Sequence, residues 1–319
     1  MYDVIALGEL LIDFTCQSVD AANYPTMAAH PGGAPANFLA ALARFGAKTA
    51  MLGKVGDDAF GHLLKNTLNA AGIETAGIVM DGSVFTTLAF VTLDQNGDRE
   101  FSFARKPGAD TRLSFEELDL RMIDESRVLH FGTLSLTNEP ARTATKKAVE
   151  YARARGKLIT CDPNLRKPLW ENPAEAREQM LWSLRQADIV KISEEEVDFL
   201  WGIGPQAGAE KILREYGAAL VFVTCGAEGC CFANRNASGR IGCLGGITVR
   251  DTTGAGDIFG GSAVWKLLRL GKAPGDLTRA ELWDIAAFAS AAAGLSTTRP
   301  GGISSVPAYE DVCAAAKTL

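Results

Sequence analysis

One short stretch combines bare backbone amides with an adjacent carboxylate. Residues 251–257 read DTTGAGD and run directly into the apolar segment 258–268. Small residues before an apolar run predict a helix start, where the first amides have no partner within the helix. The unpaired N–H groups of Gly254, Ala255 and Gly256, with the positive end of the helix dipole, favour a bound anion.

Asp257 is out of place in a turn that only binds an anion, because its charge repels a phosphate. A general base for a hydroxyl that attacks the phosphate would have to lie there. The stretch therefore predicts phosphoryl transfer, with residues 254–256 as the anion hole and Asp257 as the base. A glycine-rich helix start with a favourable N-terminal charge is the plainer alternative.

Polar and small residues in the first 40 positions are candidates for binding hydroxyl groups. Asp13 interrupts an apolar segment, so its carboxylate needs donors or lies at a strand end. Gly32 and Gly33 let the backbone approach a ligand, and Asn37 offers a donor and an acceptor near the start of an apolar helix. Solvation of Asp13 and capping or packing by Asn37 are the alternatives.

A regular pattern begins at residue 128. Strands are expected at 128–131, 157–162, 189–192 and 220–224, separated by helices at about 139–155, 173–187 and 205–216. This alternation predicts a doubly wound α/β fold, a mostly parallel sheet with helices on both faces. Ligands of such sheets collect at the carboxyl ends of strands, which selects the loops 162–166, 193–196 and 224–229.

A β-hairpin interrupts this alternation. Residues 86–93 and 100–105 flank Asn96-Gly97, a type I′ turn signal. Two strands with Phe101 and Phe103 on one face bury too little area to be stable alone. We expect a small β lid over the substrate, built from about 12–30 and 84–106, with both rings among the substrate contacts. An uncovered lid would make a homodimer through the lids natural, and a monomer is the alternative.

Composition excludes several classes of protein. The chain has 319 residues, 47% of them hydrophobic, and a net charge of −6, so a single globular domain is expected and a nucleic-acid surface is not. No signal segment or membrane-spanning run is apparent, which predicts a cytosolic protein without membrane contact. The seven cysteines form no CxxC pair and the three histidines no HExxH motif, so zinc and hydrolase chemistry have little support.

Two strings, GGAPAN at 32–37 and DTTGAGD at 251–257, resemble the signatures of the ribokinase-like sugar kinase family. The resemblance covers essentially the whole chain. It implies ATP-dependent phosphorylation of a primary hydroxyl of a sugar or nucleoside, on a doubly wound domain with a small β lid. Neither a P-loop nor a GxGxxG motif is present, which removes two rival nucleotide folds.

The family assigns roles to matching positions. Asp257 resembles the base, and an ionised aspartate of ordinary basicity is expected to suffice, because backbone donors and Mg²⁺ provide most of the stabilisation. Asp13, Gly33 and Asn37 match the positions that hold the sugar. The nucleotide loop is implied at three further positions, namely Thr224, Gly226 and Gly229.

Two cation sites are also implied by the resemblance. Many relatives have Asn-x-x-Glu where this chain has SEEE at 193–196. Glu196 is therefore expected to hold Mg²⁺ through water. Ser193 replaces the asparagine, so whether it binds the cofactor or helps to organise Mg²⁺ is open. The run 194–196 could also be only the acidic first turn of a helix. A monovalent cation such as K⁺ is implied near Asp251, Thr253, Ser296, Arg299 and Gly301.

Further strings narrow the resemblance within the family. DPNLR at 162–166, KISEEE at 191–196 and KPGAD at 106–110 look most like fructokinases, and aminoimidazole riboside kinases share several of them. Asp110 and Arg166 are added as sugar contacts, with a local ion pair as the alternative for each. The expected activity is ATP-dependent formation of fructose 6-phosphate. A kinase of another ketose or of a riboside, and an inactive sugar-binding sensor, are the other hypotheses.

Overall fold

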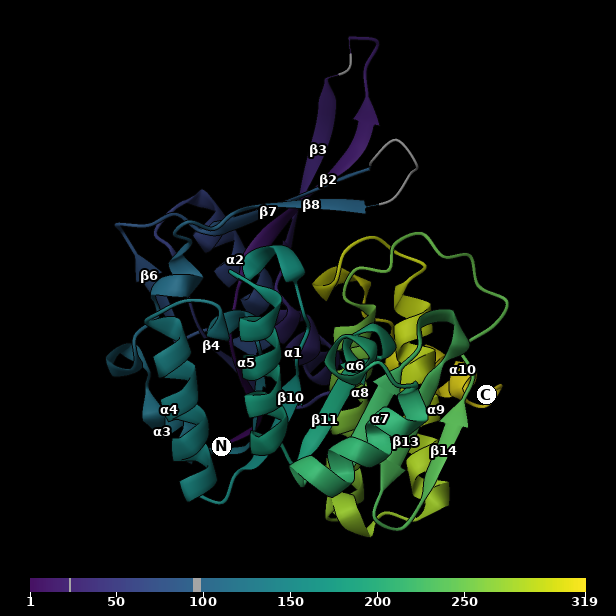
Figure 1. The fold of residues 1–319 in the computed structure, drawn as a ribbon. Coiled ribbons are helices and arrows are strands. Elements are labelled where there is room, and N and C mark those ends of the chain that lie inside the picture. Colours follow the sequence, from purple (N-terminus) through teal and green to yellow (C-terminus); the bar gives the residue numbers. More distant parts are fainter. Residues whose placement is uncertain (23, 94–98) are drawn as a thin grey trace.

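Two sheets organise the chain in this computed structural model, which describes residues 1–22, 24–93 and 99–319, the side chains of 93 and 99–101 excepted (Figure 1). The larger sheet has the order β14-β13-β12-β11-β10-β9-β1-β4-β5, and β6 also pairs with β4. Its strands run in one direction except β13, which is antiparallel to its neighbours β12 and β14 at one edge. Its strands are β1 (Tyr2–Leu7), β4 (Thr49–Gly56), β5 (Ile73–Glu74), β6 (Ile78–Asp81), β9 (Ser126–Gly132), β10 (Leu158–Asp162), β11 (Ile189–Ser193), β12 (Leu220–Thr224), β13 (Cys230–Asn234) and β14 (Ser238–Ile241).

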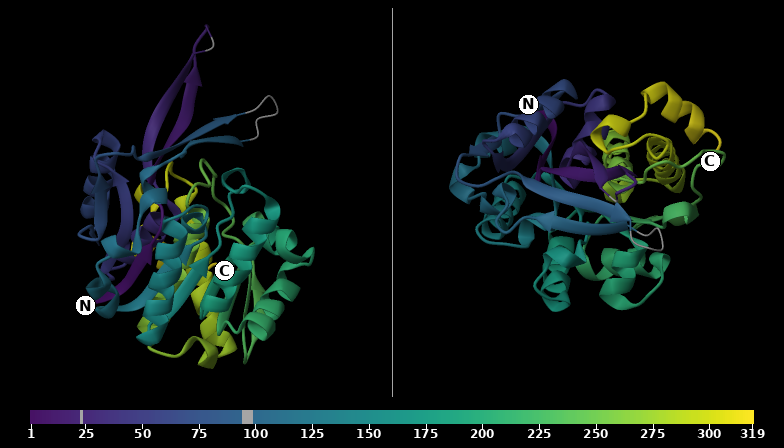
Figure 2. Two further views of the ribbon diagram at one scale, coloured as in Figure 1. Left: turned by 60° about the vertical axis from the view of Figure 1, so that its left-hand side comes forward. Right: turned by 90° about the horizontal axis from the view of Figure 1, so that it is seen from above.

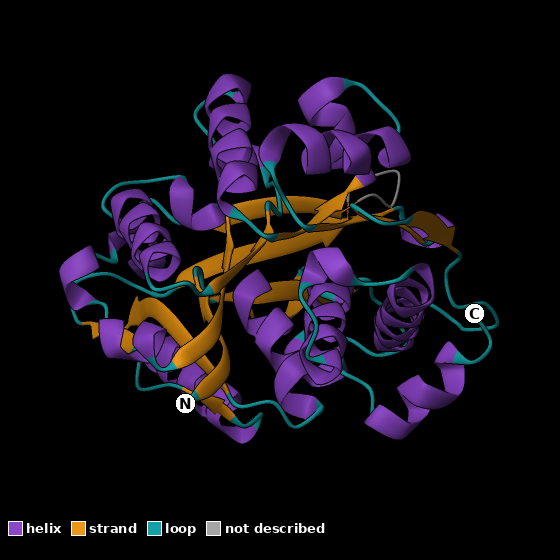
Figure 3. Cartoon of the chain, turned by 90° about the horizontal axis from the view of Figure 1, so that it is seen from below, coloured by secondary structure: helices purple, strands orange, loops and turns teal. Residues whose placement is uncertain are grey.

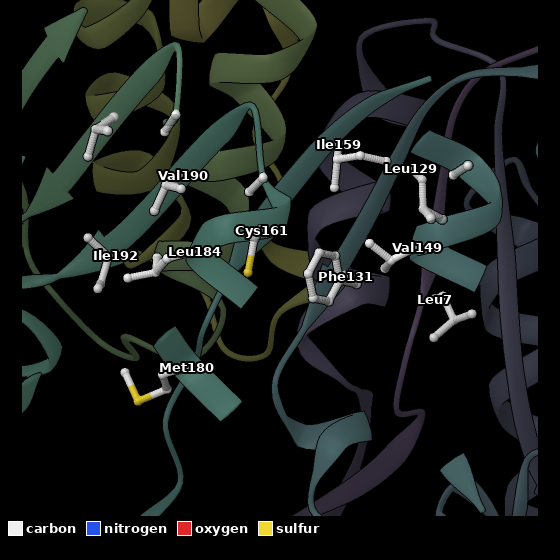
Figure 4. Close-up of a cluster of buried hydrophobic side chains, with 14 of the residues drawn as sticks. Leu7, Leu129, Phe131, Val149, Ile159, Cys161, Met180, Leu184, Val190 and Ile192 are labelled. Atoms are coloured by element: carbon white, nitrogen blue, oxygen red, sulfur yellow. The ribbon is translucent and has the colours of Figure 1, made fainter. Parts of the chain in front are cut away.

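Helices cover both faces of this sheet (Figure 3). Successive strand residues point to opposite faces, so Ile5 and Leu7 pack in one core and Val4 and Ala6 in the other. Figure 4 shows part of the first core. Its helices are α3 (Leu120–Asp124), α4 (Ala141–Ala154), α5 (Pro173–Gln186), α6 (Glu194–Trp201) and α7 (Pro205–Lys211). The other face carries α1 (Ala34–Arg44), α2 (Ala59–Ala70), α8 (Ala255–Leu270), α9 (Arg279–Ser296) and α10 (Tyr309–Ala316).

The smaller sheet has the order β3-β2-β7-β8. Its strands are β2 (Leu11–Val19), β3 (Pro25–Gly32), β7 (Thr87–Leu93) and β8 (Arg99–Ala104). Phe14 of β2 packs against Phe60 of α2 and Phe90 of β7, with ring centroids 5.5 and 5.4 Å away, which fixes this sheet to the body. The β2 and β3 strands project away from the helices (Figures 1 and 2).

The predicted fold class is confirmed. The strands of the small sheet overlap the segments expected for the lid, 12–30 and 84–106, although β2 begins at Leu11 and β3 ends at Gly32. The predicted Asn96-Gly97 turn lies outside the described residues. Two details differ from the expectations. The expected helix 205–216 is α-helical only to Lys211 and continues as one π-helical turn, Ile212–Tyr216. The acidic run 194–196 begins the separate helix α6. Among the described residues, no helix is both long and apolar enough to cross a membrane.

Candidate active site

The GAG turn lies where α8 begins, at the carboxyl edge of the parallel strands. Gly254 is the N-cap of α8 and has a φ of 76°, a conformation that glycine adopts without steric cost. A Cβ atom at this position would lie 2.8 Å from the Cα of Gly302 and 3.2 Å from Nδ2 of Asn37. The turn is therefore packed between α1 and the loop after α9, and only glycine fits there.

Asp257 follows in the first turn of α8 and meets α1. Nδ2 of Asn37 donates a hydrogen bond of 2.9 Å to Oδ2 of Asp257. Both residues line a pocket of about 280 Å³, whose walls come partly from the small sheet and from the first turns of α1 and α8. Its lining includes residues predicted to bind the sugar or the phosphoryl group, namely Asp13, Gly33, Asn37, Phe103, Arg166, Gly254, Gly256 and Asp257.

The basicity of Asp257 differs from the expectation. Burial, and then the nearby Asp162, raise the pKa of Asp257 to about 7, although Lys191, Asn37 and Arg166 act in the opposite direction. Sequence reasoning took an aspartate of ordinary basicity to suffice, whereas the loss of water around the buried carboxyl group makes Asp257 more basic. A pKa near 7 suits a general base at neutral pH.

Asp13 enters the same pocket from β2. Burial raises the pKa of Asp13 to about 6; Arg166 opposes this shift and Asp251 adds to it. Its Oδ2 atom lies 2.7 Å from where a Cβ of residue 32 would be, so Gly32 leaves room for this carboxylate. Gly33 has a φ of 117°, and a Cβ there would meet the carbonyl oxygen of Glu9 at 2.4 Å. The double glycine thus permits close packing beside the pocket.

Two predicted sugar contacts have different surroundings. Asp110 does not line the pocket; it is 5% exposed and pairs with Arg105, whose Nη2 lies 2.6 Å from its Oδ2. Thr87 also donates to Asp110, and Arg105 donates to Oγ1 of Thr137 at 2.7 Å. Asp110 is therefore part of a buried hydrogen-bond network just after the end of β8. This arrangement matches the local ion pair that was the alternative to a sugar contact. The side chain of Phe101 lies outside the described residues.

A second, larger pocket of about 640 Å³ adjoins the first. Four residues line both pockets, namely Phe103, Asn164, Arg166 and Lys191. Ser193 and Glu196 line the larger one and form a capping box at the start of α6. Oε2 of Glu196 accepts from the amide of Ser193 at 2.8 Å, and Oε1 accepts from the amide of Leu165 at 2.6 Å. Glu196 is therefore both a helix cap and the acidic group of this pocket.

The predicted nucleotide loop lies beside this second pocket. Thr224 at the end of β12 is aligned with Ser193 at the end of β11. The amide of Cys225 donates to the carbonyl of Gly229 at 2.8 Å, closing the loop that contains Gly226. None of the three predicted loop residues is among those lining the two pockets in the described part of the chain.

The carboxylate of Asp251 joins two of the segments expected to hold a monovalent cation. Oδ1 accepts from the amide and the hydroxyl of Thr253 at 2.9 and 2.7 Å, and Oδ2 accepts from the amide of Gly301 at 2.9 Å. The carbonyl of Ser296 accepts from the amide of Arg299 at 3.2 Å. Asp251, Thr253 and Gly301 thus come together. Ser296 and Arg299 form the turn that ends α9, and the carbonyl of Thr297 in this turn accepts from the amide of Asp251 at 3.1 Å.

Among the residues that sequence reasoning missed, four have charged or amide side chains that line the sugar-side pocket or lie beside it. Glu9 and Lys191 line this pocket, as does Asn164, which belonged to a selected loop but was not singled out. Asp162 lies beside it and is paired with Lys191, whose Nζ is 2.9 Å from its Oδ2. A lysine within the apolar strand 189–193 was a usable signal, because a charge there needs a partner.

The fold and this site define a class of protein. A mostly parallel sheet carries a glycine-rich helix start and a carboxylate at its carboxyl edge, under a small second sheet, as expected for ribokinase-like kinases. The chain matches the model of the pfkB family of carbohydrate kinases over residues 1–309, and it belongs to that family.

Individual relatives agree with this assignment. The chain is 41% identical to fructokinase-1 of Zea mays over 314 residues, which cover 97% of this chain and 96% of the relative. The crystal structure of the Xylella fastidiosa fructokinase with bound ATP superposes with a TM-score of 0.89 at 29% identity, covering 100% and 99% of the two chains. A double-mutant fructokinase of Vibrio cholerae O395, bound to fructose, ADP and potassium, gives 0.85 at 29%, covering 98% of each.

Proposed function

We propose that the protein transfers the γ-phosphoryl group of ATP to the primary hydroxyl of fructose, giving ADP and fructose 6-phosphate. The observation that carries this proposal is the position of Asp257. Its carboxylate and the first turn of α8 line one pocket, which continues into a larger pocket through shared residues. The names of the related fructokinases support fructose as the sugar.

Asp257 acts as the general base in this mechanism. The hydroxyl oxygen attacks the γ-phosphorus, the bond to the β,γ-bridging oxygen breaks, and the hydroxyl proton passes to Oδ of Asp257. The hydrogen bond from Asn37 orients the carboxylate. The amides of Gly254 and Gly256 stabilise the charge on the transferring group. The amide of Ala255, expected to be a third donor, instead donates to the carbonyl of Thr252 at 3.3 Å.

The sugar lies in the smaller pocket, beside Asp257. Asp13 and Asn37 supply hydrogen-bonding groups, Arg166 a cation, and Gly32 and Gly33 the space for close approach. Phe103 of β8 covers the pocket from the small sheet, which supports the lid at about 12–30 and 84–106 on a single domain of residues 1–319. Phe101 stays a predicted contact.

ATP occupies the larger pocket, with Ser193 and the loop of Thr224, Gly226 and Gly229 on the nucleotide side. Mg²⁺, when bound, neutralises charge on the phosphates. The residues present fit this ion. Glu196 faces the larger pocket, and Oδ1 of Asp162 is buried without a hydrogen-bond partner among the described residues, so a hydrated cation would supply the missing donors.

K⁺ is proposed beside the anion hole, next to the carboxylate of Asp251. Thr253 and the carbonyl groups near Ser296, Arg299 and Gly301 complete this site. The negative charge of Asp251 and the closeness of the segments that it joins fit a cation. We further propose a cytosolic enzyme that is a monomer or a homodimer through the small sheet, without nucleic-acid or membrane partners.

The experiment is a coupled assay of ADP release over a panel of sugars and ribosides with ATP and Mg²⁺. Turnover of fructose with the highest kcat/KM is expected. A preference for another ketose or for an aminoimidazole riboside would show that fructose is not the main substrate, and the proposed kinase activity would stand. A sugar-dependent melting shift without turnover of any compound would instead identify a binding sensor.

A further inference from the structure

Lys191 occupies an electrostatically unusual position. A Cβ atom on Gly256 would lie 2.8 Å from its Nζ, so the ammonium group rests against the first turn of α8. Cations are disfavoured at the N-terminal end of a helix, where the dipole is positive. Only 13% of the side chain is exposed, so water compensates little for this repulsion.

Neighbouring carboxylates hold the charge in place. Nζ of Lys191 lies 2.9 Å from Oδ2 of Asp162, at the end of the adjacent strand β10. Burial would lower the pKa of Lys191, but Asp162, Glu196 and Asp257 together raise it, so the side chain stays charged. The charged groups that face Lys191 are thus Asp162 on β10, Glu196 on α6 and Asp257 on α8. The charge of Lys191 also contributes, after burial, to the lowered pKa of His130 on β9.

The ammonium group also lies between the two pockets. Lys191 lines both the pocket that contains Asp257 and the larger pocket that contains Glu196. A phosphoryl group that moves from a nucleotide in one pocket to a hydroxyl in the other must pass this boundary. A bound phosphate there would remove the conflict between the lysine and the helix end, because both attract an anion.

We propose that Lys191 is a catalytic residue whose ammonium contacts the transferring phosphoryl group beside the α8 turn, and that Asp162 is the positioning residue that aims it. This inference rests on the proposed phosphoryl transfer from ATP. It assigns this residue a stabilising role at the transferring group, where negative charge on the equatorial oxygens must be balanced. No proton leaves Lys191 in this role.

The first test is the variant Lys191→Met, assayed for kcat and for both KM values. Loss of one donor at a transferring group typically lowers kcat by about 10²–10³-fold. We expect a loss of this size, with the melting shift caused by fructose alone retained. Lys191→Arg keeps the charge and is expected to be at least tenfold faster than Lys191→Met. A kcat of Lys191→Met within about threefold of the wild type would overturn the proposal.

A matched control separates catalysis from the loss of a buried ion pair. Lys54 is 7% exposed and pairs with Asp81 and Glu117 at 3.1 and 2.7 Å, and it lines neither pocket. Lys54→Met is expected to lower the melting temperature and to keep kcat per folded molecule within about threefold. An equal loss of kcat in this variant would show that any broken buried pair disturbs the site, and would overturn the proposal.

The double variant Asp162→Asn/Lys191→Met tests whether Lys191 serves only to neutralise Asp162. It removes both members of the ion pair, so we expect it to recover part of the melting temperature that Lys191→Met loses. The proposal requires this variant to stay slow despite its recovered melting temperature, and a return of kcat would contradict it. If the wild type turns over no sugar at all, the kinase proposal itself fails. If the wild type is active and Lys191→Met has an unchanged kcat, only the present inference is rejected.

Discussion

The carboxyl group of Asp257 is acted on by neighbours in opposite directions. Burial and Asp162 disfavour its charged form, whereas Lys191, Asn37 and Arg166 favour it. The balance leaves the pKa near 7, in the range where a base can both accept a proton and be ionised beforehand. The pKa of this one residue therefore depends on groups from two strands, the loop after β10 and the helix α1.

Asp257→Asn removes the proton acceptor and keeps the shape of the side chain. We expect kcat to fall by about 10²–10⁴-fold, the usual contribution of general base catalysis, because the amide cannot accept the hydroxyl proton. The melting shift caused by fructose should persist. A coupled ADP assay measures the effect, and Asp284→Asn, on the exposed face of α9, is the control. A rate near that of the wild type would exclude Asp257 as the base.

The dependence of the rate on pH follows from the same group. Because the base must be ionised, kcat/KM for fructose should fall with unit slope as the pH drops below about 7. Stability has the opposite sign. The pKa of Asp257 in the folded state is above the ordinary value of about 4 for an aspartate, so this group makes the fold less stable as pH rises from about 4 to about 7. Asp257→Asn should therefore melt higher than the wild type at pH 8 and not at pH 4, by calorimetry.

Sequence reasoning succeeded and failed at residues of similar kind. Asp13 was found because a carboxylate inside an apolar segment needs a partner, and Lys191 satisfied the same test but was passed over. Asp110 was assigned to the sugar because its string resembles fructokinases. Its partner Arg105 is only five positions away, yet a buried pair cannot be told from a ligand contact without the fold around it.

At the scale of single elements, Ser193 explains how this chain departs from the Asn-x-x-Glu pattern. Its side chain accepts from the amide of Glu196 at 3.2 Å, so it caps α6 as an asparagine would. Ser193→Ala should lower the free energy of unfolding by about 1 kcal/mol, measured by urea denaturation. Ser193→Asn is the matched variant and should retain the stability. Equal losses in both would contradict a capping role.

The buried pair of Arg105 and Asp110 joins β8 to the body of the protein. Arg105 also donates to the carbonyl of Leu134 at 2.9 Å, so breaking the pair leaves a buried charge without its main partner. Asp110→Asn should destabilise the fold by about 3–5 kcal/mol. Denaturation measures this change, and Asp119→Asn, in an exposed pair, should cost far less. A raised KM for fructose at unchanged stability would instead return Asp110 to the sugar site.

Element types were predictable where the periodicity was long. The strands and helices after residue 128 appear close to their expected bounds, because buried parallel strands and amphipathic helices have distinct patterns. The short strands β5 and β6 were missed, since two to four residues carry no period. The helix α6 was considered only as an alternative, because its acidic first turn reads equally well as a ligand loop.

At the scale of the whole molecule, the site is assembled from distant parts of the chain. Asn37 and Asp257 are 220 positions apart, and Phe103 comes from the second sheet. An unfolded chain therefore has no such pocket, and fructose should bind only the folded state. Fructose at 100 times its dissociation constant should raise the free energy of unfolding by about 2.7 kcal/mol. Thermal melts over a fructose series, with glycerol as the control, measure this. Turnover of fructose without any such shift would contradict the predicted site.

The hydrogen bond between Asp251 and Gly301 affects the order in which the site can form during synthesis of the chain. On a ribosome, Asp251 is added 50 residues before Gly301, whose amide braces the turn. Gly302, against which the turn packs, follows one residue later still. Because large chains fold in stages during synthesis, the earlier strands can pair while this turn stays unsupported. The turn that we propose to hold the transferring phosphoryl group is therefore braced only after residues 301 and 302 have been synthesised.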